Sequence, residues 1–204
     1  MRTELEITLI LIAYLVGSIP FGFILTKKFV GKNILKFGSG NIGSTNVRRI
    51  AGRKVAILTQ LCDMFKGLLP IGFIIFLQYY TSYTFDEFFI YAVALAVIVG
   101  HDFSIFLKFK GGKGVNTTLG ASVLLIPISV FSAVLVYFLI KWRSKYVSLS
   151  SICLALTLSI TELIIHKISY LFYYSLICSG LIIFMHHSNI RRLIKGTEIR
   201  SDEN

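Results

Sequence analysis

The chain has 204 residues, of which 55% are hydrophobic, and its mean hydropathy is +0.76. Such values lie outside the range of soluble globular proteins, so we expect an integral membrane protein that forms one domain over residues 1–204. The formal net charge of +11 is large for a chain with only 15% charged residues. Three scattered cysteines, Cys62, Cys153 and Cys178, indicate neither a disulfide framework nor a metal site.

Apolar blocks recur along the whole chain and predict an all-α polytopic membrane protein. The first block, residues 5–25, is apolar for about the 20 residues that a spanning helix needs. It ends without a small-x-small cleavage site, so we expect an anchor and not a cleaved signal. The later apolar blocks lie at 55–80, 88–107, 115–140, 146–165 and 168–185.

The charges of the connections predict the topology. The connection at 81–87 holds two acids and no base, whereas the segment 27–54 holds many Lys and Arg residues. Lysine and arginine are enriched in cytoplasmic loops, so we place 27–54 inside. The connection 81–87 and the N-terminus then lie outside.

The block 115–140 decides the rest of the topology. A single span there would export the bases of 141–145 and of the tail. A turn near Pro127, which tends to break a helix, avoids this export, because two halves of about 10–14 residues are too short to cross alone. We therefore predict seven transmembrane or half-membrane helical segments, with the C-terminus in the cytoplasm. The basic residues outside the cytoplasmic segments are then Arg2, Lys66 and Lys167.

The first polar motif, KFGSGNIGSTNVRRIAGRK, covers residues 36–54. Its glycines allow backbone N–H groups to turn toward a ligand, its hydroxyls and amides add donors, and arginine grips phosphate with two bonds. An ordinary polar loop facing lipid headgroups is the alternative. The residues that we expect to bind phosphate are Ser39, Gly40, Asn41, Thr45, Asn46 and Arg49.

A second polar loop begins at Gly111 and continues through Gly112, Lys113 and Gly114 toward Thr117 and an apolar helix. A glycine loop that enters a helix N-terminus is a natural anion site, and the lysine adds a full positive charge. The motif is not a Walker A loop, because a glycine follows the lysine. We therefore expect phosphate binding without a nucleoside triphosphatase activity.

Asp63 and Lys66 lie three residues apart inside an apolar block and share one helical face. Each charge costs about 2.5 to 3.5 kcal/mol in hydrocarbon on insertion scales, so the two should pair or face a wet cavity. A purely structural ion pair is the alternative to a substrate-binding role.

Three further residues are candidates for catalysis. His101 closes a span beside the second loop, and His186 and Asn189 are spaced to point the same way at the end of the last span. Histidine exchanges protons near neutral pH, although a buried packing role is the alternative for each.

Four segments of the chain, taken together and in order, are similar to one known family. SGNIGSTNVRR, LCDMFKGLLP, GHDFSIFLKFKGGKGV and HHSNI resemble the motifs of the bacterial membrane acyl-phosphate:glycerol-3-phosphate acyltransferases, over nearly the whole chain. The resemblance implies acyl transfer from acyl phosphate to the first hydroxyl of glycerol 3-phosphate, giving lysophosphatidic acid and phosphate. The chain departs from the family pattern at Ser104, Asn116, His187 and Ser188.

The resemblance also implies roles and partners. Lys113 and Arg49 would hold phosphate groups, with His186 as the first candidate for the base, His101 as the second and the acceptor's own phosphate as the third. No metal, cofactor or nucleic acid is expected. Membrane lipid and a soluble enzyme that forms the acyl phosphate are expected partners, with the site on the cytoplasmic side of the bacterial cell membrane.

Two other functions compete with this interpretation. A membrane carrier of phosphate esters would also use anion-binding loops at broken helices, but it needs access from both faces. A basic scaffold for anionic lipid would use clustered Lys and Arg, but it leaves the glycines beside Lys113 unexplained.

Overall fold

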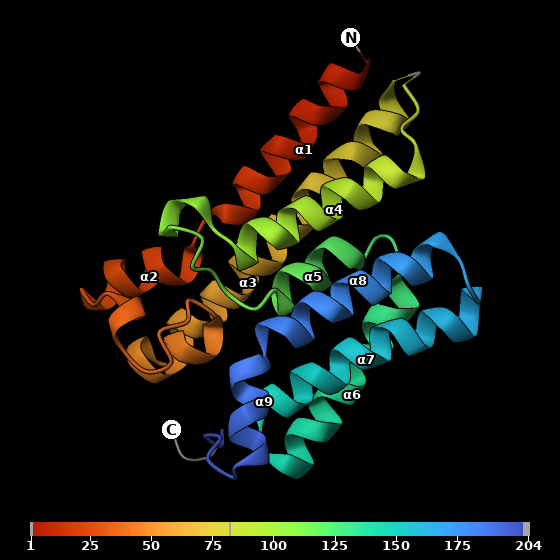
Figure 1. The fold of residues 1–204 in the computed structure, drawn as a ribbon. Coiled ribbons are helices and arrows are strands. Elements are labelled where there is room, and N and C mark those ends of the chain that lie inside the picture. Colours follow the sequence, from red (N-terminus) through yellow and green to blue (C-terminus); the bar gives the residue numbers. More distant parts are fainter. Residues whose placement is uncertain (1, 82, 202–204) are drawn as a thin grey trace. The chain divides into compact units, whose positions relative to one another are not determined.

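A computed structural model describes residues 2–81 and 83–201, and the regular structure in these ranges is helical, which confirms the all-α class (Figure 1). Five helical stretches have the length and composition to cross a membrane, or six if the bent pair at the C-terminus forms one span. The α-helices are α1 (Arg2–Ser18), α2 (Phe21–Val30), α3 (Ser44–Tyr80), α4 (Glu87–Asp102), α5 (Val115–Ser122), α6 (Pro127–Ser144), α7 (Val147–His166), α8 (Tyr170–Met185) and α9 (His187–Ile194).

The chain folds as two compact units, which divide between Leu124 and Leu125. Unit 1 holds α1 to α5, and unit 2 holds α6 to α9. A single functional domain over residues 1–204 stays a prediction.

Helices of unit 1 cross in pairs through reciprocal glycines. Gly17 of α1 and Gly100 of α4 each lie so close to the partner's backbone that a Cβ would overlap it. Gly67 of α3 and Gly120 of α5 make the same kind of crossing. Small residues let helices approach closely where lipid supplies no hydrophobic drive for association, so these glycines fix the α1–α4 and α3–α5 contacts.

The first predicted span is broken, unlike the continuous helix that hydropathy predicts. Pro20 has no backbone N–H, and α1 ends at Ser18. The carbonyl oxygen of Ser18 accepts a hydrogen bond of 2.5 Å from Ser104 Oγ. The carbonyl oxygen of Ile19 accepts one of 2.9 Å from Lys66 Nζ. Side chains from other segments therefore satisfy the backbone groups at the break, as a membrane interior requires.

Helix α3 begins earlier than the apolar block that predicts it. It starts at Ser44, and it is kinked at Gly52, which has φ +82° and ψ 175°. Thr45, Asn46 and Arg49 consequently lie on the first turns of a helix and not in a loop. A hydropathy pattern misses this segment because its residues are polar.

Pro127 marks the end of a helical interruption, as the sequence predicts. The chain leaves the helical conformation after Ser122, and Pro127 occupies the first position of α6. Helix α5 has only 8 residues, in agreement with a half-span, but α6 has 18 and is long enough to cross. The prediction of two short halves is therefore wrong for α6.

Within unit 1, the ends of the helices group as the charge pattern predicts. In unit 1, the start of α1 and the α3–α4 connection lie at one end, whereas α2 lies at the other (Figure 1). The orientation of these ends across a membrane stays a prediction.

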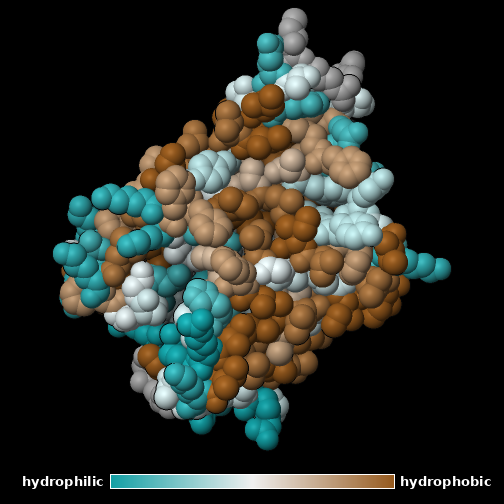
Figure 2. Space-filling model, in the orientation of Figure 1, coloured by the Kyte–Doolittle hydropathy of each residue, from teal (hydrophilic) through white to brown (hydrophobic). Residues whose placement is uncertain are grey.

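Large apolar side chains cover the helices from outside. Examples with high exposed fractions are Leu69 (62%), Phe131 (69%) and Ile164 (74%). In Figure 2, hydrophobic residues coat the helices, and hydrophilic residues gather around α2 and α9. This pattern is that of helices immersed in lipid, with polar ends.

Candidate active site

Asn46 organises the first glycine-rich loop, which connects α2 and α3. Its buried Oδ1 accepts a hydrogen bond of 3.0 Å from the Ser39 amide. Its Nδ2 donates to the carbonyl oxygens of Phe37 at 3.1 Å and Asn41 at 2.9 Å. Gly38 has φ +58°, and a Cβ there would collide with the Asn46 amide. The side chain of Asn46 is thus engaged inside the loop and fixes its shape.

Several predicted phosphate-binding residues of this loop are exposed or partly exposed. The residues Ser39 and Thr45 are exposed, and Arg49, on the second turn of α3, is partly buried. Gly40, also partly buried, has φ +68° and follows Ser39 in the turn. The hydroxyl groups in these places are accessible to an anionic ligand, and the guanidinium of Arg49 is partly so.

Asn41 joins the two glycine-rich loops. Its Oδ1 accepts a hydrogen bond of 2.8 Å from the Gly43 amide, which closes the end of the first loop. Its Nδ2 donates a bond of 3.2 Å to the carbonyl oxygen of Gly111. The two loops, 70 residues apart in sequence at this contact, therefore adjoin in unit 1.

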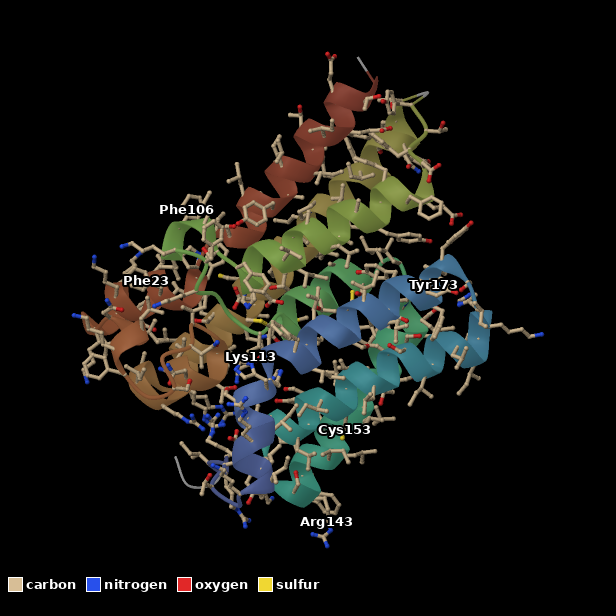
Figure 3. The ribbon with its side chains drawn as sticks, in the orientation of Figure 1. Phe23, Phe106, Lys113, Arg143, Cys153 and Tyr173 are labelled. Carbon is tan, nitrogen blue, oxygen red and sulfur yellow. The ribbon has the colours of Figure 1, made fainter. Side chains whose placement is uncertain are left out.

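The second loop carries Lys113 into the N-terminus of α5 (Figure 3). The amide of Gly112 donates a hydrogen bond of 2.9 Å to the His101 carbonyl oxygen, and Gly114 caps α5 with φ +71°. Lys113 is partly exposed beside the first-turn amides, where the helix dipole favours an anion. Thr117 is fully buried, so the structure does not expose its hydroxyl with these groups.

A buried cluster of ionisable groups lies within α3 and α4. Lys66 Nζ is 3.0 Å from Asp63 Oδ1, and His101 Nδ1 is 3.6 Å from the same oxygen. All three side chains are at most 5% exposed. The expected pairing of Asp63 with Lys66 is therefore confirmed, and the pair is buried inside the protein. Within the ranges that the structure describes, no three His, Cys, Asp or Glu side chains are arranged to hold a metal ion.

The C-terminal motif belongs to unit 2. His186 stands between α8 and α9 and is buried, with its Nδ1 2.7 Å from the carbonyl oxygen of Ile182. Asn189, also buried, lies on the first turn of α9. The bend between the two helices is 60°.

Glu198 holds the C-terminal motif together. Its Oε1 accepts a hydrogen bond of 2.6 Å from Asn189 Nδ2, and its Oε2 accepts one of 2.6 Å from Arg192 Nε. Burial acts to raise the pKa of Glu198, but the hydrogen bonds from Asn189 and Arg192 outweigh it, and its pKa lies below the ordinary value. Glu198 is therefore ionised at neutral pH and orients the Asn189 amide.

Known proteins match both the sequence and the fold. A family model described as glycerol-3-phosphate acyltransferase matches residues 7–196. The chain belongs to this family. A glycerol-3-phosphate acyltransferase of Geotalea daltonii is 46% identical over 95% of this chain and 96% of the relative. Another, from Clostridium acetobutylicum, is 38% identical over 93% of this chain and 96% of the relative.

Solved structures agree with this family. A crystal structure of PlsY (YgiH), an integral membrane glycerol 3-phosphate acyltransferase, in its glycerol 3-phosphate form superposes with a TM-score of 0.86 at 33% identity, covering 96% of this chain and 94% of that one. The lysophosphatidic acid form gives a TM-score of 0.82 at 34% identity over the same shares. This member of the family is thus an integral membrane acyltransferase, as the motifs predict, and the carrier and scaffold alternatives lose their support.

Sequence reasoning missed one residue of the acyltransferase's polar regions. Glu198 is the single acid between Ile190 and Ser201, a stretch with four basic residues. An isolated acid in a basic segment is a signal for a local ion pair, because it has several cations within reach.

Proposed function

We propose that this acyltransferase moves a fatty acyl group from an acyl phosphate to the first hydroxyl of glycerol 3-phosphate. The products are lysophosphatidic acid and inorganic phosphate. The hydrogen bond from Asn41 to Gly111 carries the proposal, because it brings two loops rich in anion-binding groups together. Donor and acceptor each bear a phosphate in this reaction, so two adjoining anion sites suit it.

The proposed chemistry needs little beyond positioning and charge. The hydroxyl oxygen of the acceptor bonds to the acyl carbonyl carbon, its proton passes to a base, and the bond from that carbon to the phosphate oxygen breaks. Phosphate leaves with the electron pair. An acyl phosphate is a mixed anhydride with a good leaving group, so alignment and neutralisation of developing charge supply much of the acceleration. No covalent acyl-enzyme is required.

The two loops would share the phosphate groups. Lys113 and Arg49 supply positive charge, and the exposed hydroxyls of Ser39 and Thr45 add hydrogen bonds. The amides at the start of α5 contribute the positive end of the helix dipole. These groups would neutralise phosphate in the ground state and the leaving phosphate in the transition state.

His186 has the hydrogen-bonding arrangement of a general base. Its Nδ1 faces the Ile182 carbonyl oxygen at 2.7 Å, and a carbonyl accepts but does not donate. Nδ1 therefore carries the proton in the neutral ring, and Nε2 is the ring nitrogen that would accept a proton from a hydroxyl. The phosphate dianion of the acceptor is the competing base, and a His186→Gln variant with unchanged kcat would favour it. Asn189 would orient the acceptor.

The expected setting is the bacterial cell membrane. The basic segments 27–54 and 108–113 favour a cytoplasmic site, with the N-terminus outside and the C-terminus inside. The apolar outer surface would accommodate the acyl chain, and a soluble enzyme would supply the acyl phosphate.

The decisive experiment uses the purified protein in detergent or lipid with palmitoyl phosphate and glycerol 3-phosphate. Lysophosphatidic acid and phosphate should form in equal amounts. Palmitoyl-CoA is the control donor and should give no product. Turnover with palmitoyl-CoA alone would leave an acyltransferase but reject the acyl phosphate as its donor.

A further inference from the structure

The glycines of the second loop are each explained by the end of α4. A Cβ on Gly111 would overlap the main-chain carbonyl oxygens of His101 and Asp102. A Cβ on Gly112 would overlap the His101 imidazole at Nε2. A Cβ on Gly114 would lie 3.0 and 3.1 Å from the two carboxylate oxygens of Asp102. The loop therefore packs closely against His101 and Asp102.

The imidazole of His101 is confined from both sides. Gly112 lies against its Nε2, and Asp63 Oδ1 lies 3.6 Å from its Nδ1. Asp63 pairs in turn with Lys66 at 3.0 Å, and Asp102, the next residue in the chain, is fully buried. Close-packed interiors transmit displacement, so the ring cannot shift without moving the loop.

We propose that His101, confined between Asp63 and Gly112, is a positioning residue that sets the location of Lys113. The inference rests on the proposed acyl transfer and refines it, because it removes His101 from the candidates for the base. A general base must come within about 2.6 to 3.2 Å of the group that it deprotonates. The backbone of Gly112 occupies the side of the ring where Nε2 would meet a substrate hydroxyl.

The consequence for catalysis follows from the geometry of the loop. Lys113 is the only member of 111–114 with a side chain, and it stands between two glycines that contact α4. A displacement of about 1 Å in a positioned group can cost roughly 100-fold in rate. Loss of the ring should therefore weaken substrate binding through Lys113.

A double-mutant cycle between His101→Ala and Lys113→Met tests this coupling. We expect His101→Ala to raise the KM of one phosphate substrate about tenfold and to leave the pH dependence of kcat unchanged. In the Lys113→Met background, His101→Ala should raise the same KM by less than about twofold, because the lysine that His101 positions is already gone. Equal losses in both backgrounds, or a lost inflection in the pH profile of kcat, would overturn the inference.

Phe89→Leu is the matched control for stability. Phe89 is buried in α4 and stacks on Phe85, with ring centroids 4.7 Å apart. Phe89 lies 12 residues before His101 on the same helix, which corresponds to roughly 18 Å. This variant should lower the unfolding temperature without changing KM. An equal rise in KM would mean that any weakening of α4 has the effect, and the specific role of His101 would be rejected.

A size exchange keeps the inference testable if His101→Ala does not fold. Gly112→Ala should harm the parent protein more than it harms a His101→Asn protein, because the smaller side chain makes room for the new methyl group. An equal effect of Gly112→Ala in both proteins would contradict the close contact between Gly112 and the His101 ring.

Failure of the proposed reaction can be separated from failure of this inference. If the parent protein uses another acyl donor, the cycle is measured with that donor. If it shows no turnover, calorimetric binding of glycerol 3-phosphate replaces KM. If the effects of His101→Ala and Lys113→Met simply add, in KM or in binding, the coupling between the two residues is rejected, and the proposed reaction is not affected.

Discussion

The two polar regions of the molecule are built in different ways. In unit 1, hydrogen bonds join Asn41 to Gly111 and Lys66 to Ile19, which are far apart in sequence, and the charge of Lys66 is almost completely buried beside Asp63. In unit 2, Glu198 contacts Asn189, nine residues away, and Arg192, whose side chain is 38% exposed. The contacts that build the first region are therefore long-range, whereas the bonds of Glu198 to Asn189 and Arg192 are local.

The ion pairs of the two regions differ in burial, and this predicts a difference in how much each contributes to the free energy of unfolding. Removing one partner of a buried ion pair costs about 3 to 5 kcal/mol, because the other charge is left without compensation. Exposed pairs contribute about 0 to 1 kcal/mol, because water screens them. Changes in unit 1 should therefore be larger than chemically similar changes in unit 2.

Lys66→Met should have the largest effect on stability. It leaves Asp63 buried without its lysine and removes the donor to the Ile19 carbonyl oxygen. We expect a loss of about 3 to 5 kcal/mol in the free energy of unfolding, measured by thermal or denaturant unfolding in detergent. The double variant Asp63→Asn/Lys66→Met should recover part of it. A loss in the free energy of unfolding no larger than that of an exposed ion pair, about 0 to 1 kcal/mol, would mean that water reaches the cluster.

Lys113→Ala should have the largest effect on activity. It removes the positive charge of the second loop, and we expect a fall of about 100-fold in kcat/KM, or about 2.7 kcal/mol, with an unchanged unfolding temperature. Lys110→Ala is the control, because Lys110 is exposed on the same segment. Similar losses in both variants would indicate general attraction of anions and not a defined site.

Asn46→Ala should have an intermediate effect. It removes three hydrogen bonds that shape the first loop, and we expect a cost of about 1 to 3 kcal/mol. Faster hydrogen exchange at the Ser39 amide would report the loosened loop. Asn33→Ala, which removes a single bond of 3.1 Å to the Leu35 amide, should change exchange less. An unchanged loop in the Asn46 variant would refute its organising role.

Glu198→Gln should have the smallest effect. It keeps the shape of the side chain but weakens the bonds to Asn189 and Arg192, at a cost of about 1 kcal/mol because Arg192 is partly exposed. The measurement is the unfolding temperature at neutral pH, together with kcat. A cost as large as that of Lys66→Met would erase the contrast between the two regions.

The same variant should reveal a dependence on pH. The pKa of Glu198 in the folded protein lies below 4.5, its ordinary value. The stability from its ionised form is therefore fully present above pH 4.5 and is lost as the pH falls through the folded pKa. The difference in unfolding temperature between parent and variant should be constant from pH 6 to 8 and shrink below pH 4.5. A difference that grows in acid would contradict this assignment.

Hydropathy and charge determined the class of fold and the order of its segments. Runs of apolar residues long enough to cross a bilayer predict helices because lipid cannot satisfy free backbone groups. Pro127 predicted an interruption, since proline lacks the donor that a continuing helix needs. The motifs predicted the family, because their order and spacing together are far more specific than any one of them.

The tertiary structure decided what those patterns leave open. The break of the first span at Pro20 is tolerated because Ser104 and Lys66, from distant segments, donate hydrogen bonds to the freed carbonyl groups. Spacing could not place Asn41 against Gly111, since that hydrogen bond depends on how α3 and α4 bring their loops together. The residue types of the site are local information, but their contacts are set by packing between segments, which no local pattern encodes.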